Sequence, residues 1–191
     1  MFNNFFVQNV LNDEQCELLI ERGLQTDLQI MRSSKIVNGK VVNQDILKLD
    51  DNKRKGSYYF EDEMKEPIFT SLTNTLLSVI NSTKIFNGIE YIDIQKYTFN
   101  QYDGGDFLNW HKDSHEIING ATATIIIQLN DNYEGGEVMY KLDNIDYTVP
   151  KKAGSVFIFD SNIEHNVNVV KSGVRYSMNA WPSSKIKKGL I

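Results

Sequence analysis

The sequence predicts a mainly β domain, a sandwich or a jelly roll, with helices flanking its sheets. From about residue 88 to residue 182 the chain consists of short apolar or alternating runs separated by turn signals, which is the pattern of an all-β core. Before about residue 85, two windows place apolar residues three and four positions apart, as amphipathic helices do. We therefore expect one domain over residues 1–191, with helical support in about 1–85 and a β core in about 88–182.

The composition is that of an ordinary globular chain. The 191 residues are 41% hydrophobic and 24% charged, which is enough for one hydrophobic core. No apolar run approaches the ~18 residues of a membrane span, and no signal peptide is expected at the N-terminus. The single cysteine, Cys16, leaves no partner for an internal disulfide, so we expect a cytoplasmic location. A formal net charge of −5 argues against nucleic acid as the main partner.

The first helix is expected over residues 12–23. Asn12 or Asp13 can cap its N-terminus, and acidic residues occupy its first turn. Gly23 can end it, because glycine readily adopts the left-handed conformation common after a last helical turn. Cys16 is then a small core residue on the buried face.

A second helix is expected over residues 66–82, with Pro67 at its first position. Between the helices, residues 35–42 have the pattern of a hairpin around an Asn-Gly turn, and residues 50–57 that of a charged loop. An alternative interpretation makes the segment 31–60 a mobile flap over a functional site. The apolar face of the second helix comprises Phe69, Leu72, Leu76 and Ile80.

Short strands are expected throughout the C-terminal half. The first begins after Gly88 and alternates to Phe99. Gly104 and Gly105 permit a turn with positive φ before the next extended segment, and residues 183–188 are expected to form a loose end. Six further predicted strands cover residues 121–129, 137–142, 145–149, 155–160, 165–170 and 174–180.

Residues 102–113 end in the first candidate metal ligands, His111 and Asp113. Side chains two positions apart on an extended segment lie on the same side, so both can reach one metal ion. The other histidines are His115, in a segment with the pattern of a surface loop, and His165, which follows an apolar run typical of a buried strand. Two imidazoles and one carboxylate leave three positions open on a metal, as in non-haem Fe(II) oxygenases.

Further residues extend this pattern in a fixed order. Tyr102 lies nine residues before the first candidate histidine, and Arg175 lies ten residues after His165. Two glycine-containing segments, 130–137 and 150–157, stand between them. In this order the blocks resemble the 2-oxoglutarate- and Fe(II)-dependent dioxygenases, specifically their prolyl-4-hydroxylase-like branch.

The resemblance implies a double-stranded β-helix core, the cupin-like form of the jelly roll. It implies a hydroxylase that uses Fe(II), 2-oxoglutarate and O2, with ascorbate as a further candidate cofactor. The implied metal ligands are His111, Asp113 and His165. Arg175 would pair with the far carboxylate of 2-oxoglutarate, because a buried carboxylate is costly unless paired and arginine offers two hydrogen bonds. Tyr102 would add a hydroxyl hydrogen bond.

The substrate stays open at this point. The resemblance suggests a prolyl side chain of a peptide or protein, while free amino acids, other small metabolites and modified nucleobases are alternatives. A non-catalytic metal-binding jelly roll or a zinc hydrolase on a similar barrel is the alternative function, and Arg175 argues against both, because neither needs a buried cation there. Trp110 and Trp181 are interpreted as core or rim aromatics, and Asp103 and Asp106 as loop residues.

Overall fold

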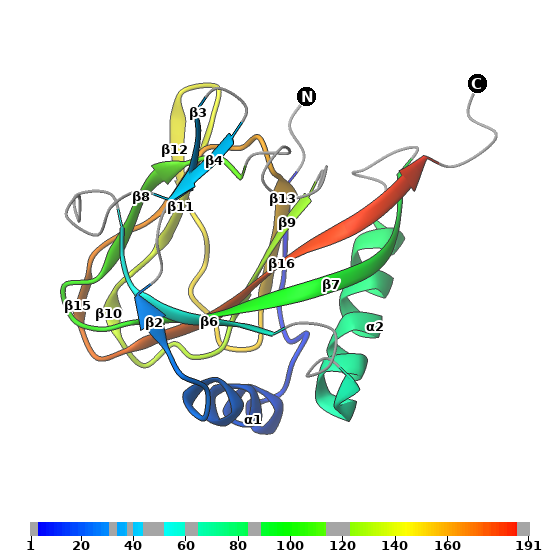
Figure 1. Ribbon diagram of the computed structural model, residues 1–191, viewed down its shortest axis with the longest axis horizontal. Coiled ribbons are helices and arrows are strands. Elements are labelled where there is room, and N and C mark those ends of the chain that lie inside the picture. The colour runs from blue at the N-terminus through cyan, green and yellow to red at the C-terminus, as the bar shows by residue number, and fades with distance from the viewer. Residues whose placement is uncertain are drawn as a thin grey trace.

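The computed structural model describes residues 4–30, 34–37, 40–43, 52–59, 65–83, 89–113 and 123–186. These residues form two helices and a set of short antiparallel strands (Figure 1). Within the described ranges, neither helix combines the length and the apolar character that crossing a bilayer requires.

Two antiparallel sheets make up most of the fold. Among the described residues the larger has the strand order β1-β13-β9-β16-β7-β6-β2, and the smaller has the order β12-β11-β14-β8-β5. The strands of the larger sheet are β1 (Asn4–Val7), β13 (Val156–Asp160), β9 (Ala123–Gln128), β16 (Arg175–Ile186), β7 (Ile89–Tyr102), β6 (Lys55–Tyr59) and β2 (Gln29–Ile30). Those of the smaller sheet are β12 (Ile145–Thr148), β11 (Val138–Leu142), β14 (His165–Val167), β8 (Phe107–His111) and β5 (Asn52–Lys53). Two short pairs complete the set, β10 (Glu134–Gly135) with β15 (Val170–Ser172) and β3 (Ser34–Val37) with β4 (Lys40–Asn43).

The larger sheet separates two apolar layers, because alternate side chains of a strand point to opposite faces. On β9, Ile125 and Ile127 belong to the layer that includes α1 (Asp13–Leu24) and α2 (Pro67–Ser82), whereas Ile126 belongs to the layer shared with the smaller sheet. Both helices thus cover one face of the larger sheet, and the smaller sheet covers the other (Figure 1). This arrangement confirms the predicted mainly β class with flanking helices.

The helix α1 begins as predicted but does not end as predicted. The Asn12 side chain accepts a hydrogen bond from the backbone N–H of Gln15 (2.8 Å), and the Gln15 side chain accepts one from the Asn12 backbone (3.0 Å), which together form a capping box. Gly23 does not terminate the helix, which continues to Leu24. A Cβ atom at position 23 would lie 2.4 Å from the Phe99 ring, so this glycine permits close packing of the helix on β7.

The helix α2 follows its prediction closely. It begins at Pro67 and buries Phe69, Leu72, Leu76 and Ile80 in the layer that contains Tyr97 and Phe99 of β7. Gly105 has a φ of 88°, which confirms the expected positive-φ turn between β7 and β8.

The charged segment 50–57 was predicted as a loop, and this is wrong for its described residues. They form β5 and most of β6, which pair with β8 and β7. Backbone hydrogen bonds to the neighbouring strands hold β5 and β6 in the sheets, so these strands form without an apolar run in their sequence. The exposed Lys55 also forms an ion pair with Asp103 (2.8 Å). The described part of the suggested flap 31–60 therefore includes sheet strands, and β3 and β4 form the expected hairpin pair, whose turn lies outside the described residues.

The C-terminal strands also differ from their predicted bounds. The expected strand 165–170 is two strands, β14 and β15, interrupted at residues 168 and 169. The loose end expected from residue 183 is wrong up to Ile186, because β16 continues alongside β7 to that point. The end of β16 carries mostly polar side chains, so its sequence lacks the alternation that predicts a strand. Pairing with the long strand β7 holds it in the sheet. Pro182 lies at a register shift, where a strand tolerates proline.

Candidate metal centre

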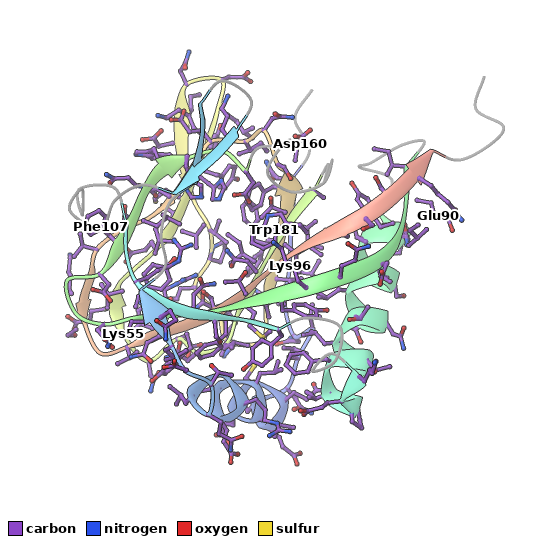
Figure 2. All side chains as sticks on the ribbon, viewed as in Figure 1. Lys55, Glu90, Lys96, Phe107, Asp160 and Trp181 are labelled. Carbon is purple, nitrogen blue, oxygen red and sulfur yellow. The ribbon has the colours of Figure 1, made fainter. Side chains whose placement is uncertain are left out.

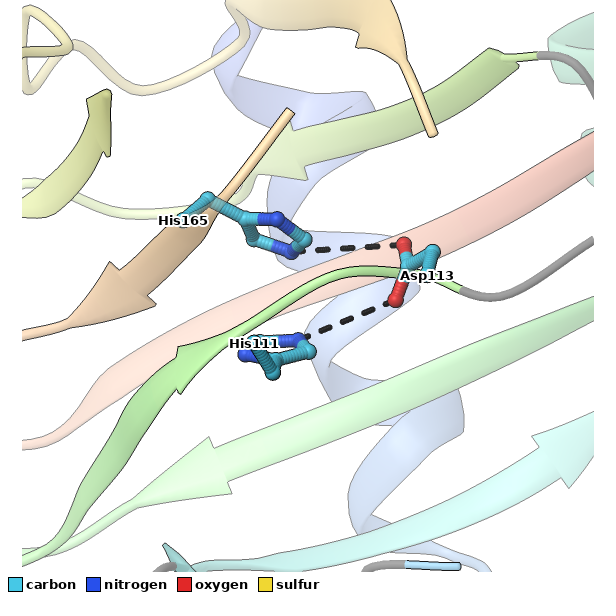
Figure 3. A group of neighbouring side chains, drawn as sticks. All are labelled: His111, Asp113 and His165. Atoms are coloured by element: carbon cyan, nitrogen blue, oxygen red, sulfur yellow. Dashed lines mark ion pairs between the residues drawn. The ribbon is translucent and has the colours of Figure 1, made fainter. Parts of the chain in front are cut away.

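His111, Asp113 and His165 converge between the two sheets (Figure 3). His111 ends β8, and His165 begins β14 directly opposite it in the antiparallel register. Asp113 follows β8 by two residues. The Nε2 atom of His111 lies 3.7 Å from Oδ1 of Asp113, and the Nε2 atom of His165 lies 4.0 Å from Oδ2. One potential ligand atom from each residue lies within 4.8 Å of the others, which is close enough to surround a single ion.

Both imidazoles are oriented by backbone carbonyl groups. The Nδ1 atom of His111 lies 2.8 Å from the Asn109 carbonyl oxygen, and that of His165 lies 3.0 Å from the Ile163 carbonyl oxygen. A carbonyl oxygen only accepts, so Nδ1 carries the proton in each ring. The Nε2 lone pairs then remain for coordination, and they face the Asp113 carboxylate (Figure 3).

The carboxylate of Asp113 is fixed by two donors that come from the larger sheet. Thr124 of β9 donates its hydroxyl hydrogen to Oδ2 (2.7 Å), and the indole N–H of Trp181 on β16 donates to the same oxygen (3.0 Å). The sequence predicts Trp181 only as a core or rim aromatic and does not indicate a role for Thr124. No local signal marks either residue, because a threonine in a β-branched strand looks like ordinary strand composition.

The protonation states of this cluster suit metal coordination. Burial and the positive charge that His165 can carry together lower the pKa of His111 to about 4, against the opposing effect of Asp113. Burial alone would raise the pKa of Asp113, but the two imidazoles and the hydrogen bonds from Thr124 and Trp181 hold it below its ordinary value. At neutral pH His111 is therefore neutral and Asp113 is ionised, the forms that bind a cation.

The depressed pKa of His111 predicts a pH-dependent stability of the metal-free protein. In the unfolded chain this imidazole takes up a proton near pH 6.5, but in the folded chain only near pH 4. Between these values the unfolded state binds more protons, so stability falls as the pH is lowered through this window. We expect the urea midpoint, measured with a chelator present, to drop from pH 7 to pH 5, and to drop less in His111→Asn. An equal drop in both proteins would contradict this assignment.

Arg175 is a fully buried cation, with 1% of its surface exposed. Its Nη1 donates to the Ser177 hydroxyl (2.8 Å) and its Nη2 to the Gln128 side-chain oxygen (3.1 Å), both neutral acceptors. Its buried Nε has no hydrogen-bond partner, and no carboxylate in the described part of the chain forms an ion pair with it. A buried charge left uncompensated is strongly destabilising. The arrangement therefore favours an anionic ligand.

Tyr102 lies beside this cation. It is paired with Arg175 in the register of β7 and β16, is buried, and has its ring centroid 5.0 Å from the guanidinium carbon of Arg175. The guanidinium carbon of Arg54, on the segment between β5 and β6, lies 5.9 Å from the same centroid. These are cation–π distances, so Tyr102 contributes to the electrostatics of the site through its ring.

The tryptophans and the loop aspartates considered from the sequence make contacts of their own with charged or backbone groups. The Lys141 ammonium lies 4.4 Å from the ring centroid of Trp110 and is also close to Glu164 (3.9 Å). The Lys96 ammonium lies 5.5 Å from the ring centroid of Trp181 (Figure 2). His115 is not among the described residues. Asp103 and Asp106 belong to the turn before β8, as expected, with the Asp106 side chain accepting from the Asp103 backbone N–H.

Comparison with known proteins identifies relatives of this region. Residues 97–183 match the family model of the 2OG-Fe(II) oxygenase superfamily. A PKHD-type hydroxylase of Shewanella baltica is 28% identical over 96 residues, which cover 47% of this chain and 43% of that protein. A PKHD-type hydroxylase of Prochlorococcus marinus is 24% identical over 187 residues, or 96% of this chain and 80% of that protein. The match to the first of these relatives spans less than half of its length.

Solved structures share the fold at lower identity. A Pseudomonas putida prolyl-4-hydroxylase has a TM-score of 0.72 at 16% identity, with 99% of this chain and 95% of that chain covered. A viral collagen prolyl hydroxylase from Paramecium Bursaria Chlorella virus-1 gives 0.71 at 17%, covering 96% and 97%. A Trichoplax adhaerens prolyl hydroxylase in complex with a hypoxia inducible factor peptide fragment gives 0.69 at 17%, covering 94% and 83%. These likenesses confirm the predicted jelly-roll fold.

Proposed function

We propose that this chain, whose residues 97–183 match the family model of the 2OG-Fe(II) oxygenase superfamily, is an Fe(II)- and 2-oxoglutarate-dependent hydroxylase of the prolyl-4-hydroxylase-like type. One observation carries the proposal: two histidines and an aspartate converge in the same sheet-lined interior that contains a buried arginine without a counter-charge in the described residues. The first group suits a metal ion and the second an organic anion.

The proposed metal ligands are His111, Asp113 and His165. Two imidazoles and one carboxylate are the donor set of non-haem Fe(II) oxygenases, which leave the remaining positions open. Bound there, Fe(II) would supply oxidation of a C–H bond with O2 and 2-oxoglutarate, chemistry that no side chain can supply. The protein's own part is to keep both Nε2 atoms unprotonated, to keep the carboxylate ionised, and to hold all three groups between rigid strands.

The proposed partner of the far 2-oxoglutarate carboxylate is Arg175, supported by Tyr102. The guanidinium is preorganised, since Ser177 and Gln128 hold its two terminal nitrogens. Burial strengthens its attraction for an anion, because little water screens the charge. A zinc hydrolase or a non-catalytic metal-binding jelly roll has no use for this cation, so Arg175 favours the oxygenase over both alternatives.

The proposed substrate is a prolyl side chain of a peptide or protein. The support is indirect: relatives of this chain are named PKHD-type hydroxylases, and structures of the same fold are prolyl hydroxylases, one of them with a peptide. A free amino acid or a small metabolite is the alternative class.

The test is product formation by the reconstituted enzyme. With Fe(II), 2-oxoglutarate, ascorbate and O2, proline-containing peptides or a metabolite extract should yield succinate together with a product heavier by one oxygen atom, measured by mass spectrometry. Asp113→Ala should lose both products. Asp146→Ala, which removes a half-exposed carboxylate from the outer strand β12, should retain them. Metal binding without succinate from any substrate pool would replace the oxygenase by a metal-binding protein.

A further inference from the structure

We propose that Thr124 and Trp181 are positioning residues that set which oxygen of Asp113 meets the metal. They saturate Oδ2 with hydrogen bonds and leave Oδ1 as the coordinating atom. The inference rests on the proposed function and deepens it, because it identifies the groups outside the ligand set on which metal affinity depends.

The direction of the Thr124 hydrogen bond follows from chemistry. A carboxylate only accepts, so at 2.7 Å from Oδ2 the Thr124 hydroxyl is the donor. Thr124 also lies 3.1 Å from the Ser161 hydroxyl, and both residues have no exposed surface. Since the single hydroxyl proton of Thr124 is already used, Ser161 donates to Thr124. The hydrogen bond from Ser161 polarises the Thr124 hydroxyl and so strengthens the hydrogen bond that Thr124 donates to Asp113.

Trp181 reaches the same oxygen from a different strand. Its indole N–H is a donor only, and it lies 3.0 Å from Oδ2. Alternation along β16 places Trp181 on the face that carries Arg175 and Ser177, which is the face turned to the smaller sheet. The register of β16 with β7 shifts between Ala180 and Pro182, and such irregularities are frequent beside active sites.

The two donors together leave the carboxylate oxygens unequal. An ionised carboxylate oxygen has two lone pairs, and Oδ2 accepts two hydrogen bonds, one from Thr124 and one from Trp181. Each oxygen lies near one imidazole, Oδ1 at 3.7 Å from Nε2 of His111 and Oδ2 at 4.0 Å from Nε2 of His165, but Oδ1 accepts no hydrogen bond from a described residue. Oδ1 is therefore the oxygen available to an ion held by the imidazoles. Loss of such an outer partner typically reduces metal affinity 10–100-fold.

The test compares metal affinity in matched pairs of variants. Thr124→Val keeps the side-chain shape and removes the hydroxyl, whereas Thr124→Ser keeps the hydroxyl. Trp181→Phe removes the indole N–H, and Trp110→Phe makes the same change at the other tryptophan. The dissociation constant for Mn(II) is read from the electron paramagnetic resonance signal of free Mn(II), and the Co(II) visible spectrum reports coordination geometry.

We expect Thr124→Val and Trp181→Phe each to raise the Mn(II) dissociation constant about 10–100-fold and to alter the Co(II) spectrum. Thr124→Ser and Trp110→Phe should remain close to the wild type. Thermal unfolding in the presence of a chelator shows whether each metal-free variant folds. If Thr124→Val does not fold, Trp181→Phe still tests the inference independently.

Several outcomes would overturn the positioning role. Wild-type affinity in both Thr124→Val and Trp181→Phe would do so, as would an equal loss in Thr124→Ser, since the hydroxyl would then not matter. The failure of the proposed function looks different: the wild type would bind no Mn(II), or His165→Ala would bind it as tightly as the wild type. In that case both the proposed function and the positioning role would be wrong.

Discussion

Replacing His165 by alanine is expected to abolish stoichiometric Fe(II) binding. The His165 side chain is 3% exposed, begins β14 opposite His111, and offers a lone pair that the Ile163 carbonyl keeps turned toward Asp113. Without it, only one imidazole and one carboxylate remain. The loss should exceed the ~100-fold that removal of an outer hydrogen-bond partner costs, because a ligand itself is removed.

Anaerobic equilibrium dialysis with Fe(II) measures this directly. His111→Ala should have the same effect, since the two imidazoles play equivalent parts in the cluster. His115→Ala is the matched control among the three histidines and should bind one ion per chain as the wild type does. Full affinity in His165→Ala, or loss of binding in His115→Ala, would show that the ligand set is wrong.

Replacing Arg175 by methionine is expected to remove the stabilisation that 2-oxoglutarate provides. A ligand that binds only the folded state, at about 100 times its dissociation constant, adds ~2.7 kcal/mol. For a domain of this size that corresponds to roughly 5–10 °C in melting temperature, at about 2–4 °C per kcal/mol. The wild type with Mn(II) should gain this increment on addition of 2-oxoglutarate. Arg175→Met lacks the charge and its hydrogen bonds, so most of the increment should disappear.

The metal-dependent increment separates this effect from general damage. Arg175→Met changes none of the proposed metal ligands, so Mn(II) alone should stabilise it as it does the wild type. The metal-free variant should fold, because replacing a buried unpaired cation by an apolar side chain removes a desolvation penalty. Lys185→Met, on the exposed end of the same strand, should keep both increments.

An unchanged 2-oxoglutarate shift in Arg175→Met would move the role to another cation. The two lysines that lie beside tryptophan rings, Lys96 and Lys141, are the next cations to consider. In the structure Lys141 lies within 3.9 Å of carboxylate oxygens of Asp146 and Glu164, so its charge is already compensated. Lys96 lies beside the Trp181 ring, which makes it the next residue to replace (Figure 2).

Much of the fold and of the candidate site could be predicted from local pattern. Helix α2 has apolar residues at helical spacing and a proline at its first position, and helix α1 has a capping residue at its start. These signals act within one or two turns, so the sequence alone contains them. The order of residue types along the chain likewise indicated five side chains that the structure brings to one interior: Tyr102, His111, Asp113, His165 and Arg175.

Long-range contacts decided the rest. Gly23 was predicted to end α1, but its role depends on Phe99, which approaches the helix from β7. The strands β5 and β6, and the last residues of β16, carry polar side chains and are held by backbone hydrogen bonds to partners far along the chain. These partner strands lie far away in the sequence, so the polar composition of each segment by itself indicated a loop.

The hydrogen bonds to Asp113 illustrate the same division. The amino-acid order alone shows a carboxylate two residues after a histidine and an arginine ten positions after the last histidine. The folded domain brings Thr124, eleven residues away, and Trp181, sixty-eight residues away, within hydrogen-bond distance of one oxygen of that carboxylate. Residue types show which side chains can bind a metal, whereas the choice of hydrogen-bond donor depends on sheet register, which is set by the packing of the whole domain.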